Sequence, residues 1–233
     1  MRRSSPIVSP MLRFVEEIVL LLLRDDDGKF VNVPQSSMDR AIAGAVLMEL
    51  AMENRIDTDL EHLILIDGTP LDDSLLDPTL AMIAEGQGVE GQERDARYWV
   101  EQMARQAPEI REEALARLVE RGIIEREDDR FLWVFRSRRY PMVDGEAERE
   151  VKLRIMGVLF SNEIPSPRDV VIICLAHACG IFNELLSKRE LEQASARIEQ
   201  VRKLDLIGQA MSQSIQDFEI WLANAAVQGR GFF

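Results

Sequence analysis

Residues 170–186 read VVIICLAHACGIFNELL and contain one of the two most apolar runs of the 233-residue chain. The apolar part, Val170–Phe182, is too short for a membrane-spanning helix, which requires about 17 apolar residues. Ser166, Pro167 and Asp169 precede it in an order typical of a helix start: a capping serine, a proline in the first turn and an acid three positions later. We therefore predict a buried helix over Val170–Leu186 at the centre of the fold.

Further helices are predicted on both sides of this stretch. Apolar residues at helical spacing predict a helix over Leu12–Arg24. Ser36 and Asp39 have capping-box spacing and predict a second helix from Ser37 to about Asn54. The other elements expected are a strand over Leu63–Ile66 and helices over Ser74–Ala84, Arg94–Ala107, Glu109–Glu120, Glu146–Phe160, Lys188–Leu204 and Leu206–Val227.

A β-hairpin is predicted where two apolar runs flank an acidic turn. The runs are Ile123–Ile124 and Phe131–Phe135, and the turn is Glu127–Asp129. Gly122 is expected to end the preceding helix, and Pro108 to separate that helix from the one before it.

These patterns predict a mainly α protein, a single helical domain around a central hydrophobic helix with one protruding β-hairpin. Apolar residues make up 46% of the chain, enough for a sizeable core. No internal repeat and no long linker divides the sequence. The expected organisation is a flexible segment over residues 1–11, the domain over residues 12–227 and a tail over residues 228–233.

Charge restricts the classes of partner. The chain has 28 basic and 41 acidic residues, a formal net charge of −13, so it is a poor candidate for coating nucleic acid or an anionic membrane. Any site for an anion must be a local patch. No targeting or spanning segment is recognised, and the expected compartment is the cytosol. Two cysteines exclude a disulfide scaffold.

One basic island stands out against this background. Residues 130–139 contain Arg130, Arg136, Arg138 and Arg139 and no acid. Arginines of this kind attract anionic headgroups, and the neighbouring Leu132, Trp133 and Val134 are suited to a headgroup boundary or to self-association. In the alternative interpretation Trp133 packs on the core and the arginines pair with Glu125, Glu127 and Asp144.

Several segments together resemble the Golgi phosphoprotein 3 family, in the family's order over about residues 12–225. The matching segments are Leu12–Leu23, Leu47–Ala51 with Arg55 and Ile56, Thr69–Pro70 with Leu75–Asp77, Leu118–Ile124 and Leu175–Ala178. The resemblance, to a prokaryotic type of member, implies a compact helical domain around one hydrophobic helix. In eukaryotic members it implies binding of phosphatidylinositol-4-phosphate.

The resemblance also indicates where the family's lipid pocket would lie. That pocket consists of a tryptophan and three basic residues, whose positions fall near Pro34 and on Ala43, Pro108 and Arg111. Only Arg111 matches the pattern. The implied function is a non-enzymatic peripheral membrane adaptor, Golgi-associated in a eukaryote. It would bind a phosphoinositide or another anionic headgroup through Arg111, Arg136, Arg138 and Arg139.

Two other functions remain open from the sequence. One is a soluble interaction module that self-associates through the hairpin residues Leu132, Trp133 and Val134. The other is a winged-helix regulator built from residues 109–135, although Glu109, Glu112, Glu113 and Glu120 would repel a phosphate backbone.

Catalysis is not expected. The sequence contains no phosphate-binding loop, dinucleotide fingerprint or metal-ligand spacing, so neither a cofactor nor a metal is predicted. His177, Cys174 and Cys179 lie in the apolar run and are expected to be buried and unreactive. Glu49, in an otherwise apolar helix, is expected to bond a backbone N–H or an arginine.

Overall fold

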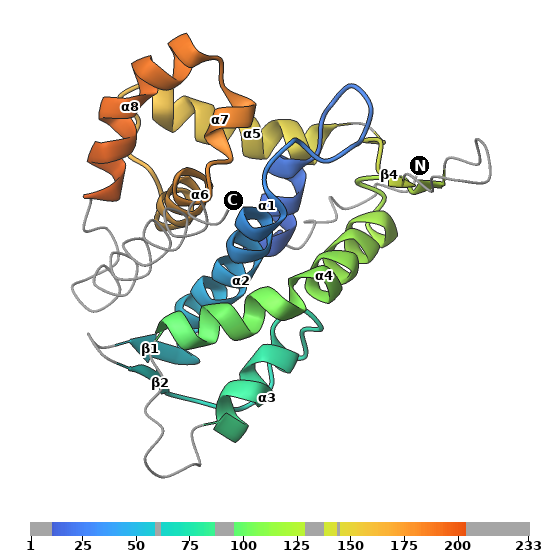
Figure 1. Ribbon diagram of the computed structural model, residues 1–233, viewed down its shortest axis with the longest axis vertical. Coiled ribbons are helices and arrows are strands. Elements are labelled where there is room, and N and C mark those ends of the chain that lie inside the picture. Colours follow the sequence, from blue (N-terminus) through green and yellow to red (C-terminus); the bar gives the residue numbers. More distant parts are fainter. Residues whose placement is uncertain (1–10, 59–61, 87–95, 129–137, 144, 204–233) are drawn as a thin grey trace, which may run out of the picture.

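The computed structural model describes residues 11–58, 62–86, 96–128, 138–143 and 145–203, and confirms the mainly helical fold (Figure 1). Within these residues the helices are α1 (Phe14–Leu22), α2 (Gln35–Met52), α3 (Asp77–Gly86), α4 (Ala96–Glu120), α5 (Glu146–Phe160), α6 (Pro167–Ala178), α7 (Phe182–Leu185) and α8 (Lys188–Arg202). Two antiparallel strand pairs accompany them: β1 (Ile56–Thr58) with β2 (Leu63–Leu65), and β3 (Glu127–Asp128) with β4 (Arg138–Arg139).

The central helix is α1 rather than the predicted helix over residues 170–186. Every residue of α1 is buried, and the helix packs against α2, α4, α5 and α6. The predicted helix is divided into α6 and α7 near Gly180, whose φ of +73° is unfavourable for residues with a side chain. The prediction of one unbroken helix was wrong because the backbone turns at Gly180, whereas the other apolar run, Ile18–Leu23, is fully buried as its composition indicates.

The capping signals succeeded at one helix and failed at another. Ser166 Oγ accepts a hydrogen bond from the Asp169 N–H, and Asp169 accepts one from the Ser166 N–H, as predicted for α6. The capping box at Ser36 is absent, because α2 already begins at Gln35, after Pro34 and without a side-chain cap.

Pro108 does not break the chain into two helices, contrary to prediction. It lies on the exposed side of the continuous helix α4. Buried residues lie along the other side of α4 both before and after Pro108, and the helix packs against α2. These buried residues include Trp99, Met103, Ala107, Ala114 and Leu118. The helix that the winged-helix alternative requires is therefore half of a longer one.

The hairpin is longer than predicted. Glu127 and Asp128, expected in the turn, form β3 and pair with Arg139 and Arg138 of β4. An isolated bridge between Ile124 and Met142 continues the pairing toward the domain. The predicted strand over residues 131–135 and the predicted helix over residues 206–227 lie outside the described residues.

Candidate functional site

The basic residues predicted to bind an anion come from two elements. Arg111 lies on α4, and Arg138 and Arg139 form β4, which lies beside the end of α4 (Figure 1). An ion pair of 2.8 Å between Arg138 Nη1 and Glu112 Oε2 joins the two elements next to Arg111. The other predicted site residues, Arg136, Leu132, Trp133 and Val134, lie outside the described residues.

Arg111 is held by uncharged groups. Its guanidinium carbon lies 5.4 Å from the centre of the Phe30 ring, and its Nη1 lies 3.2 Å from Met38 Sδ. The buried Nε has no hydrogen-bond partner, and among the described residues no carboxylate pairs with Arg111. An arginine positioned by a ring and a sulfur keeps hydrogen-bonding capacity for an anion from outside.

The loop between α1 and α2 positions the Phe30 ring. Phe30 bridges to Leu23, and the ring meets Tyr140 edge to face with centroids 6.3 Å apart. The Tyr140 N–H donates to the Gly28 carbonyl at 2.8 Å, which attaches the loop to the base of the hairpin. Gly28 has φ +63°, and a Cβ built there would meet the Tyr140–Pro141 backbone at 2.5 Å. The loop, the hairpin base and α4 therefore meet at one surface, which we call the arginine face: Phe30, Arg111, Arg138 and Arg139.

The other two arginines of the arginine face lie close to acids. Arg138 and its partner Glu112 are both half-exposed. The strand register places Glu127 opposite Arg139, and Glu127 is one of the acids of the alternative interpretation. Phe30 and Met38 were not predicted as part of this surface, because nothing local in the sequence connects them to Arg111.

A second group of charges lies inside the molecule, at α1. Glu16 and Glu17 are buried, and so is Glu49 of α2. Arg168 joins two of them: its Nε lies 3.0 Å from Glu17 and its Nη1 lies 3.3 Å from Glu49. Burial raises the pKa of Glu49, and the Phe14 N–H and the nearby arginines oppose this shift. The expectation that Glu49 bonds a backbone N–H or an arginine is confirmed.

A cavity of about 680 Å³ opens beside this buried group. Its arginines are already engaged by carboxylates: Arg13 bonds Asp73 at 2.9 Å, and Arg117 bonds the same residue at 2.7 Å. Arg168, also in the lining, is occupied as described above. These arginines already have carboxylate partners and therefore offer little to a ligand.

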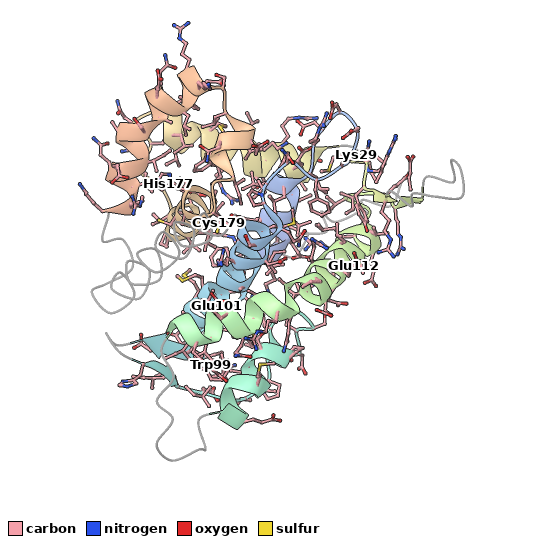
Figure 2. The ribbon with its side chains drawn as sticks, in the orientation of Figure 1. Lys29, Trp99, Glu101, Glu112, His177 and Cys179 are labelled. Atoms are coloured by element: carbon pink, nitrogen blue, oxygen red, sulfur yellow. The ribbon has the colours of Figure 1, made fainter. Side chains whose placement is uncertain are left out.

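The histidine and the cysteines of α6 and its C-terminus are not arranged for catalysis. Burial lowers the pKa of His177 and raises the pKa of the Cys179 thiol to about 12. Figure 2 shows both residues at α6, away from Lys29 and Glu112 on the side of β4. Among the described residues, no group of three or more potential ligands could hold a metal ion.

Cys179 is expected to resist alkylation in the folded protein. With a pKa of about 12, roughly one thiol in 10,000 is ionised at pH 8, and the group is also buried. Iodoacetamide followed by peptide mass spectrometry should find Cys179 unmodified in native protein and fully modified in urea. Rapid modification of the native protein would contradict the burial seen here.

Comparison with known proteins agrees with the architecture. None of the described helices combines the length and the apolarity needed to cross a membrane. A search of curated proteins finds no match. The profile of Golgi phosphoprotein 3 (GPP34) matches residues 14–218, which include all the described helices and both strand pairs. The chain therefore belongs to the Golgi phosphoprotein 3 family.

Proposed function

We propose that the protein is a non-enzymatic peripheral membrane adaptor that binds an anionic phospholipid headgroup at the arginine face. The observation that supports this most directly is Arg111, whose guanidinium is held by the Phe30 ring and Met38 and has no carboxylate partner among the described residues. Arg111 is also the residue that coincides with the family's headgroup pocket.

The chemistry of the arginine face suits a phosphate group on a membrane. A guanidinium can donate two parallel hydrogen bonds to phosphate oxygens, and each arginine near an anionic leaflet contributes about 1 kcal/mol. The overall charge of −13 opposes adhesion elsewhere on the surface. Binding is therefore expected to be reversible and dependent on this one face.

The other positions of the family's pocket favour a broader headgroup preference than phosphatidylinositol-4-phosphate alone. Ala43 is fully buried within α2, and Pro34 and Pro108 provide neither charge nor a backbone N–H. A phosphomonoester carries close to two negative charges, which a single arginine matches poorly. We propose that the ligand class includes singly charged headgroups such as phosphatidylglycerol.

Replacing Arg111 with alanine is expected to weaken vesicle binding about tenfold, the effect of losing hydrogen bonds to a charged group. The measurement is flotation with phosphatidylcholine vesicles containing no anionic lipid, phosphatidylglycerol or phosphatidylinositol-4-phosphate. Arg189→Ala provides the matched control, because Arg189 is an exposed arginine on α8. Binding of the parent should also weaken as salt increases.

Either of two results would overturn the proposal. One is equal flotation of Arg111→Ala and the parent on anionic vesicles. The other is equal flotation of the parent on vesicles with and without anionic lipid. Preference between the two anionic lipids would decide how specific the headgroup recognition is.

A further inference from the structure

The loop between α1 and α2 is attached at two places, of which the arginine face is one. At the other, the Lys152 ammonium of α5 donates to the carboxylates of Asp25, in the loop, and Glu148, one turn earlier in α5. The single ammonium of Lys152 therefore lies against both carboxyl groups. We call this group the acid clasp: Asp25, Glu148 and Lys152.

The acid clasp holds one more acid than base. Glu148 is 5% exposed, and burial together with the neighbouring Asp25 carboxylate raises its pKa to about 7. The neighbouring Glu148 carboxyl group and the Lys152 ammonium lower the pKa of Asp25. Glu148 therefore keeps its proton up to about pH 7, whereas Asp25 is already ionised at that pH. With the proton bound the clasp is neutral, and without it the two carboxylates repel each other across a single ammonium.

Other charges around the acid clasp do not supply the missing cation. Within the loop, Arg24 bonds Asp26 at 2.8 Å and lies 3.5 Å from Asp27. A hollow of about 610 Å³ lies beside the acid clasp and is lined in part by Asp25 and Lys152. Glu184 and Glu190, on the side of α7 and α8, line the same hollow and add further negative charge. Loss of the proton therefore leaves the end of the loop held less tightly to α5.

The loop is short and internally bonded, so its two attachments are mechanically connected. Arg24 N–H donates to the Lys29 carbonyl, and Gly28 N–H donates to the Arg24 carbonyl, at 2.8 and 3.0 Å. These bonds close a ring that contains Asp25 on one side and adjoins Phe30 on the other. Displacement of Asp25 therefore displaces Phe30, the ring under Arg111.

We propose that the acid clasp positions Phe30, and through it Arg111, so that the protein binds anionic headgroups more tightly below neutral pH than above it. This inference rests on the proposed function. The direction of the pH dependence follows from the proton on Glu148. The folded protein retains this proton up to about pH 7, whereas an ordinary glutamate loses it at a much lower pH. The loop is firmly held below that pH, and its attachment weakens as pH rises through it.

The test is flotation on phosphatidylglycerol vesicles at about pH 6 and about pH 8, one unit on either side of that pKa. A phosphodiester keeps the same charge at both values. Binding by the parent should fall about fivefold or more, the lower end of typical coupling between sites. Glu148→Gln, which mimics the protonated acid, should bind the vesicles equally at the two pH values. Its binding should be as tight as that of the parent protein measured at about pH 6. Glu150→Gln, on the exposed side of α5, should behave like the parent.

Hydrogen exchange separates the acid clasp from lipid binding. Protection factors of the Gly28 and Val31 amides, corrected for the intrinsic effect of pH, should fall from about pH 6 to about pH 8 in the parent but not in Glu148→Gln. If protection changes in this way but the parent does not float with the vesicles at either pH, the acid clasp is supported and the proposed function is overturned. Flotation by the parent that does not change with pH, or protection that does not change with pH, would overturn the present inference.

Discussion

Replacing Arg168 with methionine is expected to lower the free energy of unfolding by about 3–5 kcal/mol. Methionine keeps much of the apolar stem but removes the charge that joins the buried Glu17 and Glu49. It also removes the cation that lies 4.2 Å from the centre of the Phe14 ring. The loss is large because two carboxylates remain in the interior with fewer partners. Urea unfolding followed by circular dichroism measures it.

Two further variants distinguish a charge effect from a packing effect. Arg189→Met makes the same exchange on the surface of α8 and should change stability by less than about 0.5 kcal/mol. Adding Glu17→Gln to Arg168→Met should recover part of the loss, because one of the stranded charges is removed. A cost below about 1 kcal/mol for Arg168→Met would show that Arg154 and Arg13 are sufficient without it.

Replacing Gly28 with alanine is expected to lower the free energy of unfolding by about 3 kcal/mol. The residue has φ +63°, which costs an alanine about 1 kcal/mol. The larger part comes from the new Cβ, which would meet the backbone of Tyr140 and Pro141 at 2.5 Å. Because backbone atoms cannot turn aside as a flexible side chain can, the loop must separate from the hairpin base.

Gly122 provides a matched control for this prediction. Its φ is +68°, nearly that of Gly28, but nothing lies within 4 Å of a Cβ built there. Gly122→Ala should therefore show the backbone cost alone, about 1 kcal/mol. Equal losses of stability in the two variants would mean that the contact of Gly28 with the hairpin base is unimportant. Urea unfolding of both proteins under the same conditions makes the comparison.

Local patterns predicted several helices well. The expected boundaries of α5 coincide with those observed, and the predicted cap of α6 is present. Both signals lie within a few neighbouring residues, where the 3.6-residue period and the capping hydrogen bonds operate. Pro108 misled the prediction because its effect depends on whether tertiary packing supports both sides of the helix, which the sequence around it does not record.

The burial of Glu16 and Glu17 in α1 could not be predicted from the residues around them. Two adjacent glutamates favour a surface position unless distant cations neutralise them. The partners here, Arg117, Arg154 and Arg168, come from three later helices, and no local rule connects them to Glu16 and Glu17.

The arginine face was predictable in part. The sequence placed Arg138 and Arg139 after the predicted strand Phe131–Phe135, whereas the structure has them in the paired strand β4. The family resemblance selected Arg111. The contacts of Phe30 and Met38 with Arg111 could be recognised only in the structure. Phe30 lies in the loop between α1 and α2 and Met38 lies in α2, both far from Arg111 in the sequence. The pairing of Arg138 with Glu112 likewise depends on where the hairpin meets α4.

The charges around α1 also bear on how the chain is made. Synthesis proceeds from the N-terminus, so Glu16 and Glu17 leave the ribosome long before Arg168 and its neighbours. Until Arg154 and Arg168 emerge, the first helix cannot be enclosed without stranding the Glu17 carboxylate in a dry interior. Completion of the nascent domain must therefore wait for its last third, and truncated translation products should remain open and be readily degraded.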